Sequence, residues 1–256
     1  MDPHTQTDTR PRLGVVGAGR LGSALAIALR NAGYPVEGPA GRGERPLDCE
    51  AIVLCVPDAE IPAAAAAVAG AAPVIGHTSG ATPLSALDPA GAAACFGLHP
   101  LQSFGGESRG DAFHGSGCAV AGSTPAALGL AQRIARDLGM TPFEIEEQGR
   151  AAYHAAASMA SNFLVTLEAG AERLAGGAGL APEQARALLA PLVLQTVANW
   201  AELGPERALT GPVARGDEAT VAAQRAAVEQ AAPELLALFD ELVERTRELA
   251  AGRVTA

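Results

Sequence analysis

One short segment near the start of the chain constrains its fold more than any other. The apolar run Leu13–Val16 is followed at once by Gly17-Ala18-Gly19-Arg20-Leu21-Gly22 and then by a helix-like stretch, Ser23–Asn31. In this G-x-G-x-x-G pattern the first glycine makes a tight turn, the second admits a pyrophosphate, and the third lets helix and strand pack closely. The phosphates would lie on free N–H groups at the helix N-terminus. The six residues predict a dinucleotide-binding turn, and with it a soluble nicotinamide-dependent oxidoreductase.

The first half of the chain alternates short apolar runs with helix-like stretches, which is typical of a parallel α/β sheet. The expected helices after the first are an alanine-rich one ending near Ala69 and one over Pro125–Leu138. Further strands are expected at Tyr34–Glu37, Ala51–Val56, Pro73–Gly76, Cys95–Leu98, Cys118–Ala121 and Pro142–Ile145. The order of these elements predicts a doubly wound Rossmann sheet.

The pattern changes near residue 146. Three helical stretches follow, over Gln148–Gly176, Pro182–Leu203 and Glu218–Ala250, and each is bounded by Gly or Pro. We therefore expect a polar tail at residues 1–12, a Rossmann domain at 13–146 and an all-helical substrate and dimerisation domain at 147–256.

Charge and composition exclude several classes of function. The 256 residues carry a formal charge of −10, which argues against nucleic acid or an anionic membrane as partner. No lysine occurs, so neither a Schiff-base lysine nor a lysine acid is available. The four cysteines lack metal-site spacing, and their reduced state would suit the cytoplasm. No secretory signal or membrane-spanning stretch is visible. No metal site is expected.

The residues after the second strand bear on which nicotinamide is bound. Glu37 lies at about the distance, some twenty residues from Gly17, at which NAD sites carry an acid for the ribose hydroxyls. However, we expect the strand to end nearer Gly38–Gly41, followed by Arg42 and Arg45. Arginine can grip a 2′-phosphate with paired donors, although a solvated polar loop would have the same composition. We favour NADPH.

Two further strand ends are expected to border the cofactor. Val56-Pro57-Asp58 ends the third strand, and His77-Thr78-Ser79-Gly80 follows the fourth. The carboxyl ends of parallel strands meet at the edge where the ligand binds. Val56, Pro57, Asp58, His77 and Ser79 are therefore candidate cofactor residues, while His77 is equally compatible with capping a turn.

Four segments together resemble a known group of proteins: Gly17–Gly22, Gly97–Phe104, Tyr153–Asn162 and Ala208–Asp217. The group consists of Rossmann-like proteins with a helical C-terminal domain of unknown function. They are relatives of pyrroline-5-carboxylate reductase and ketopantoate reductase in the 6-phosphogluconate-dehydrogenase-like superfamily. The resemblance implies an NADP-binding reductase that dimerises through its helical domain, with some members linked to pantothenate synthesis. The better-known ketopantoate reductases rely on a catalytic lysine, which this chain lacks.

A polar stripe is expected on the long helix after residue 146. His154, Ser158, Ser161 and Asn162 follow one another at i, i+4, i+7 and i+8 among alanines. Small neighbours leave room for a ligand, so His154, Ser158 and Asn162 are candidate catalytic residues. The stripe could instead make hydrogen bonds to the Rossmann domain.

Other candidate catalytic residues come from three places in the chain. His99, after an apolar strand and before Pro100, resembles the His-Pro segment of prephenate dehydrogenases and could donate a proton, or else cap a turn. The loop with Thr210, Arg215 and Asp217 is similar to the carboxylate-binding loop of pyrroline-5-carboxylate reductases, although Asp217 also fits a helix N-cap paired with Arg215. Asn199 is the remaining polar candidate.

The leading interpretation is an NADPH-dependent reductase of a small α-keto acid, specifically 2-dehydropantoate. The alternatives are an imine reductase of the pyrroline-5-carboxylate type, a prephenate-like dehydrogenase, and a non-catalytic NADP-binding sensor. The substrate carries a carboxylate in the leading interpretation and in both enzymatic alternatives.

Overall fold

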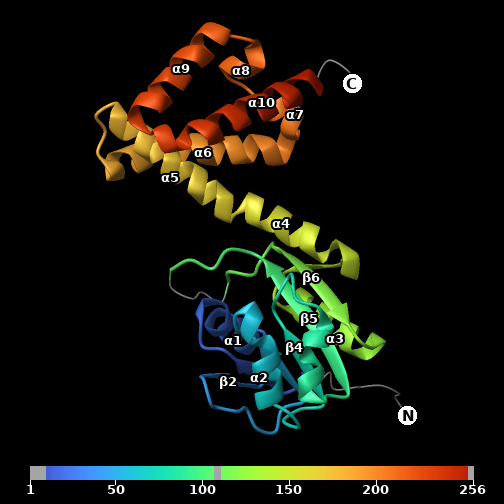
Figure 1. Ribbon diagram of the computed structural model, residues 1–256. Coiled ribbons are helices and arrows are strands. Elements are labelled where there is room, and N and C mark those ends of the chain that lie inside the picture. The colour runs from blue at the N-terminus through green and yellow to red at the C-terminus, as the bar shows by residue number, and fades with distance from the viewer. Residues whose placement is uncertain (1–9, 107–110, 253–256) are drawn as a thin grey trace. The chain divides into compact units, whose positions relative to one another are not determined.

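The structure is a computed structural model that describes residues 10–106 and 111–252 (Figure 1). The chain divides into two compact units, one reaching to Ser161 and one starting at Asn162. The composition changes near residue 146, but the helix α4 (Arg150–Ala160) belongs to the first unit. The reason is local, because Tyr153 on α4 packs edge-on against Phe143 of the sheet. We describe each unit by itself.

The first unit is built on a seven-stranded sheet with the order β2-β1-β3-β4-β5-β6-β7. Neighbouring strands from β2 to β5 are parallel, β6 is antiparallel to β5, and β7 is parallel to β6. The strands are β1 (Leu13–Val16), β2 (Val36–Ala40), β3 (Ala51–Leu54), β4 (Val74–His77), β5 (Ala94–Leu101), β6 (Gly117–Gly122) and β7 (Thr141–Glu144). The prediction of a doubly wound α/β sheet followed by helices is confirmed.

The central strands form because their residues are apolar on both faces. All four residues of β3 are buried, with Ala51 and Val53 in one core cluster and Ile52 and Leu54 in another. Successive side chains of a strand point to opposite faces, so the two clusters lie on the two sides of the sheet. The first cluster contains residues of α1 (Arg20–Asn31) and α3 (Pro125–Asp137), and the second contains residues of α2 (Ile61–Ala67) and of the 3-10 turn η2 (Leu84–Ala90).

Three strands differ from the sequence prediction by two residues or more, and one of them, β3, ends at Leu54 rather than Val56. β2 starts at Val36 rather than Tyr34, because the Tyr34 side chain is buried and its hydroxyl donates to Asp137 at 2.8 Å. β5 continues past Leu98 to Leu101, because His99 and Pro100 pair with Ala119 and Cys118 of the antiparallel β6. His99 therefore lies inside a strand rather than after it.

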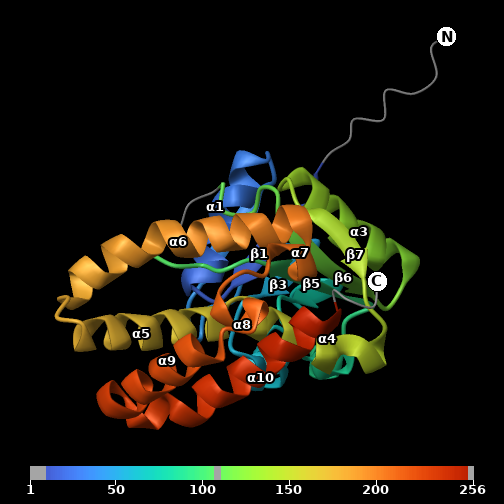
Figure 2. The same cartoon turned by 90° about the horizontal axis from the view of Figure 1, so that it is seen from above.

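The second unit is helical, with α5 packed against α6 and α9 against α10 (Figure 2). Its helices are α5 (Asn162–Gly177), α6 (Pro182–Leu203), α7 (Pro205–Ala208), α8 (Pro212–Arg215), α9 (Glu218–Ala231) and α10 (Leu236–Gly252). None of the helices among the described residues has the length and apolar character needed to cross a membrane.

The long helical stretches of the sequence are each divided in the structure. The stretch Gln148–Gly176 becomes α4 and α5, separated at Ser161, whose φ of −122° and ψ of −74° are not helical. The stretch Glu218–Ala250 becomes α9 and α10, separated by the 3-10 turn η4 (Pro233–Leu235). Proline lacks the N–H that would continue the α9 hydrogen bonds.

Candidate functional site

The turn between β1 and α1 has the geometry of a phosphate cradle. Gly17 has a φ of +107°, and a Cβ atom there would lie 2.1 Å from the Cys55 carbonyl oxygen. At Gly22 a Cβ atom would lie 1.9 Å from the carbonyl oxygen of Gly17. At Gly19, by contrast, a Cβ atom would meet nothing within 4 Å. The first and third glycines are thus required by packing, while the second leaves open the space that a pyrophosphate needs.

The start of α1 suits an anion as well. Gly19 is the N-cap, no side chain caps the helix, and the first turn contains no acidic residue. The N–H groups of this turn therefore keep their partial positive charge for a ligand. The Ala18 carbonyl accepts a hydrogen bond from Ser23, while Arg20 and Leu21 form the first helical residues. These residues fit a bound dinucleotide.

The segment after β2 carries both arginine and an acid, and the acid, Glu44, accepts a hydrogen bond of 2.7 Å from the N–H of Gly41. β2 ends at Ala40, so Arg42 follows the strand end closely, and one of its terminal nitrogens lies 3.2 Å from each carboxylate oxygen of Glu60. Glu37 lies within the strand and pairs with Arg12. Arg42 is almost fully exposed, and an exposed ion pair of this kind exchanges readily for a phosphate.

The ends of four parallel strands meet at one edge of the sheet. Val16 pairs with Leu54, Leu54 with His77, and His77 with Gly97. The segment Val56-Pro57-Asp58 leaves this edge, with Asp58 as the first residue of the 3-10 turn η1 (Asp58–Glu60). On the next strand, Ser79 closes its own loop by accepting hydrogen bonds from the N–H groups of Ala81 and Thr82.

His77 is completely buried at this edge. Its Nδ1 accepts a hydrogen bond of 3.2 Å from the N–H of Ser79, which places the ring proton on Nε2. Burial lowers the pKa of His77 to about 4, so the ring is neutral at physiological pH. His77 therefore shapes the loop around Ser79, as the turn-capping interpretation expects.

His99 extends beyond the end of β4 and meets α4. The hydroxyl oxygen of Tyr153 lies 2.7 Å from its Nδ1, and the two rings stand at 87° with centroids 5.5 Å apart. The centroid of His154 is 6.3 Å from that of His99. Burial, followed by the nearby His154, lowers the pKa of His99 to about 4. A neutral imidazole at this place can donate a hydrogen bond but carries no charge.

Arg150 brings a positive charge to the same place. Only 7% of the residue is exposed, and its Nε donates to Glu147 at 2.8 Å. After burial as the largest cause, its positive charge also acts on the pKa of His77, of His99 and of Tyr153, in each case lowering it. The edge of the sheet thus combines neutral hydrogen-bond donors with a buried cation, which suits a carbonyl compound that also carries an anionic group.

The sequence interpretation missed Tyr153 and Arg150 as site residues. A signal was present, because Arg150, Tyr153 and His154 are spaced at i, i+3 and i+4 and hence share one face of a helix. The stripe proposed instead began at His154 and assumed a helix that continues through Ser161, where the structure has a break. Ser158 lies on α4, and Asn162 begins α5 in the second unit.

The other candidates lie in the second unit. Asn199 on α6 accepts a hydrogen bond of 2.8 Å from Gln195, and Thr210 precedes α8, which ends at Arg215. Asp217 is the N-cap of α9: its carboxylate accepts from the N–H of Thr220 at 3.1 Å and from the hydroxyl of Thr220 at 2.7 Å. For Asp217 the structure thus gives the N-cap role that was the alternative from sequence.

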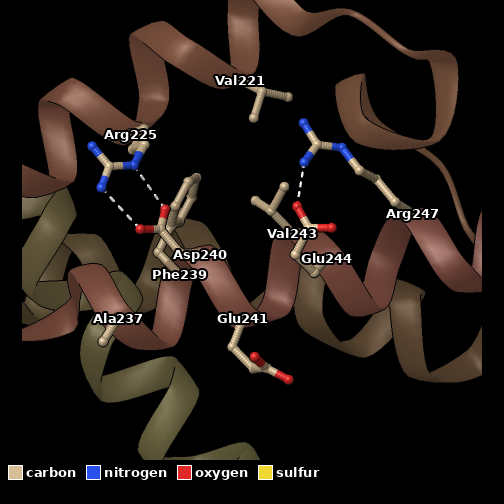
Figure 3. A pocket seen from close by; sticks show the side chains of 9 residues that line it. All are labelled: Val221, Arg225, Ala237, Phe239, Asp240, Glu241, Val243, Glu244 and Arg247. Atoms are coloured by element: carbon tan, nitrogen blue, oxygen red, sulfur yellow. Dashed lines mark hydrogen bonds and ion pairs between the residues drawn. The ribbon is translucent and has the colours of Figure 1, made fainter.

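The second unit contains a cavity of 390 Å³ between α9 and α10 (Figure 3). Arg225 and Asp240 face each other across it through two hydrogen bonds of 2.9 Å, and Arg247 pairs with Glu244. The lining also contains Glu241, so three carboxylates face two arginines, and the cavity has no excess of positive charge to attract a carboxylate substrate.

Comparison with known proteins identifies the family. Residues 116–246 match the family described as "Domain of unknown function (DUF2520)". The chain belongs to this DUF2520 family. The matched segment contains α4 with Tyr153 and His154, and it leaves the glycine turn and His99 of this DUF2520 protein outside. A search of curated proteins found no match.

Solved structures share the fold of this DUF2520 protein. BF3122 from Bacteroides fragilis, provisionally named an NADP oxidoreductase, is 20% identical with a TM-score of 0.79, over 94% of this chain and 99% of that one. Protein TM1727 from Thermotoga maritima is 27% identical with a TM-score of 0.72, over the same shares. A pyrroline carboxylate reductase from Plasmodium falciparum with NADP bound is 12% identical with a TM-score of 0.60, again over 94% and 99%.

Proposed function

We propose that this DUF2520 protein is an NADPH-dependent oxidoreductase that reduces a small α-keto acid. The observation that carries the proposal is the place of His99, a neutral hydrogen-bond donor on β5 two residues beyond the pairing of Gly97 with the last residue of β4, at the sheet edge that also carries the glycine cradle. In open α/β sheets this edge is where ligands bind. The similar fold of a pyrroline carboxylate reductase with NADP bound supports a nicotinamide cofactor.

Residues of the first unit would hold the dinucleotide. The N–H groups after Gly19 would bind the pyrophosphate, and Arg42 with Arg45 would bind the 2′-phosphate. Val56, Pro57, Asp58, His77 and Ser79 would border the rest of the cofactor at the strand ends. When bound, the nicotinamide supplies a hydride.

The chain's own residues would bind the substrate and handle the proton. Arg150 would share its guanidinium between Glu147, which accepts from Nε at 2.8 Å, and the substrate carboxylate. His99 would donate a hydrogen bond, and then a proton, to the keto oxygen. His154, 6.3 Å from His99 between ring centroids, would line the same place. Within this class we propose 2-dehydropantoate as the substrate.

The second unit offers separate proposals from the sequence. Thr210 and Arg215 remain proposed carboxylate-binding residues, and Ser158, Asn162 and Asn199 remain proposed polar contacts. Replacing each singly by alanine and measuring the KM of the keto acid would test them.

Purified protein, mixed with NADPH and 2-dehydropantoate, should oxidise NADPH, as followed by its nicotinamide absorbance. His99→Gln should slow turnover about 100-fold or more, the usual effect of a general acid, while leaving NADPH affinity unchanged. A parallel arm with pyrroline-5-carboxylate tests imine reduction. Oxidation in that arm alone would overturn the keto-acid assignment. NADPH binding without turnover of any carbonyl or imine in a broader panel would favour the sensor.

We also propose a homodimer through the helical unit. α6 is apolar on several sides, and its large side chains are exposed, with Leu188 at 60%, Leu192 at 64% and Trp200 at 57%. Large apolar side chains exposed together on one helix are normally covered, and the family resemblance makes a second copy the occupant we propose. Light scattering should give twice the chain mass, and Leu192→Glu should reduce it; a monomeric wild type would contradict the proposal.

The redox state of the cysteines supports the proposed cytoplasmic location. Cys49, Cys55, Cys95 and Cys118 are all free thiols, and burial raises the pKa of each. Reduced, unreactive thiols are typical of a reducing compartment.

A further inference from the structure

We propose that Tyr153 positions His99 and relays a proton to it: the Tyr153 hydroxyl donates to Nδ1, which directs the Nε2 proton of His99 to the substrate oxygen. The proposal rests on the reductase function proposed above. It concerns Tyr153, a residue that the sequence motifs gave no role of its own.

The hydrogen bond between Tyr153 and His99 can run in either of two directions. A neutral histidine has one N–H donor and one acceptor nitrogen, and a tyrosine hydroxyl has one hydrogen to donate. Among the described residues, the Tyr153 hydroxyl has no acceptor other than Nδ1 of His99, at 2.7 Å. Either direction leaves one hydrogen of the pair, the hydroxyl hydrogen or the Nε2 proton, without a protein acceptor among the described residues. Donation from Tyr153 is the direction that leaves the Nε2 proton of His99 for the substrate oxygen.

The surroundings hold both rings in place. A Cβ atom on Gly80 would lie between 2.8 and 3.0 Å from Cε1, Nδ1 and Nε2 of His99, so the imidazole lies against the Gly80 backbone. Phe143 packs against Tyr153 at 70°, with ring centroids 5.9 Å apart. Because each ring has a packing partner on a different element, the 2.7 Å hydrogen bond is held by the fold and not by α4 alone.

The proton steps balance over one turnover. The substrate oxygen takes the Nε2 proton of His99, and Nδ1 takes the phenolic proton of Tyr153, so no imidazolate anion forms. The transient Tyr153 phenolate is stabilised by Arg150, whose charge lowers the pKa of this hydroxyl against the larger effect of burial. After product leaves, Nε2 takes a proton from water and the Nδ1 proton returns to Tyr153. The hydride needed for reduction comes from the nicotinamide of the proposed function.

Charged and titratable groups from three other elements also act on His99. They are His77 at the end of β4, Asp58 in η1, and His154 and Arg150 on α4. Asp58 raises the pKa of His99, while the two other histidines and Arg150 lower it, after burial as the largest cause. The imidazole thus remains neutral in the pH range where the relay requires it to accept one proton and release another.

The two tyrosines of the chain give a matched pair of variants. Tyr153→Phe removes the hydroxyl beside His99, while Tyr34→Phe removes one that donates to Asp137 at 2.8 Å. Nitrogen-15 NMR of the ligand-free protein reports the tautomer of His99, and its signals are assigned by their loss in His99→Gln. We expect an Nε2–H tautomer in the wild type and in Tyr34→Phe, and a mixture of tautomers in Tyr153→Phe.

Kinetics test the relay. With 2-dehydropantoate, kcat of Tyr153→Phe should fall about 10- to 100-fold, with an unchanged Kd for NADPH, while Tyr34→Phe keeps the wild-type kcat. An Nδ1–H tautomer in the wild type, or an unchanged kcat in Tyr153→Phe, would overturn the proposal. If the wild type reduces no carbonyl, the proposed function and the proton relay are both refuted. The positioning of His99 by Tyr153 is then still tested by the NMR result.

Discussion

A Cβ atom on Gly22 would lie 1.9 Å from the carbonyl oxygen of Gly17, whereas one on Gly19 would meet nothing within 4 Å. The two glycines should therefore respond oppositely to alanine. Gly22→Ala would push the start of α1 away from the Gly17 carbonyl and should lower the free energy of unfolding by about 3 kcal/mol. Gly19→Ala should cost at most about 1 kcal/mol, as an N-cap change, but should weaken NADPH binding.

Thermal unfolding and NADPH titration of both variants check this. Gly129→Ala, at a helical site where a Cβ atom also meets nothing within 4 Å, is the matched control for added bulk. Full NADPH affinity in a folded Gly19→Ala would show that no phosphate approaches this backbone.

The buried His77 should make stability depend on pH. Its pKa is lowered from 6.5 to about 4, so between these values the unfolded chain binds more protons than the folded protein. The free energy of unfolding must then fall as pH drops through that window. From pH 7 to pH 4.5, His77 alone should account for about 2 to 3 kcal/mol.

Urea unfolding at the two pH values measures this loss. His77→Asn, which keeps an acceptor for the Ser79 N–H, should lose less stability on acidification than the wild type, even though its carboxylates titrate alike. An equal loss in both proteins would mean that His77 is charged or exposed in the fold.

Arg42 should decide between the two nicotinamide dinucleotides. Replacing it by alanine removes the charged donor for the 2′-phosphate and should raise the Kd of NADPH about 10-fold or more, with little change for NADH. Glu60→Gln, which removes the acid that Arg42 now contacts at 3.2 Å, should tighten NADPH binding. Fluorescence titration with both dinucleotides measures each effect, and a wild type that prefers NADH would refute the assignment.

The N-cap at Asp217 should matter for stability and not for chemistry. Asp217→Asn keeps an oxygen for the N–H of Thr220 and should unfold at nearly the wild-type Tm. Asp217→Ala should lower Tm by a few degrees, because α9 loses its cap. Both should turn over keto acid at the wild-type rate; a slow but fully stable Asp217→Asn would restore Asp217 to the substrate site.

The cofactor half of the molecule is predictable from sequence because its signals are local. Gly17 and Gly22 make the close backbone approaches that their spacing implies, Gly19 has open space beside it, and the buried runs of β1 and β3 read directly as parallel strands. Such features depend on a few adjacent residues.

The part of the fold around His99 depends on contacts between residues that are distant in the sequence. Local sequence patterns do not report such contacts. The extension of β5 through His99 exists because β6 pairs with it, and Tyr153 reaches His99 from 54 positions away. The break at Ser161 likewise interrupts a stretch that is helical on both sides. Helical spacing could indicate that Arg150, Tyr153 and His154 share a face, but not which strand they meet.

The exposed Trp200 on α6 is also the only tryptophan in the chain. The wavelength of tryptophan fluorescence emission therefore reports on the surroundings of α6 alone, without an added fluorophore. A blue shift with rising protein concentration would register the covering of α6 directly, and the same cuvette could follow NADPH by energy transfer from the indole. Trp200 is one of the exposed apolar side chains of α6, and its fluorescence can also follow the assembly of two copies.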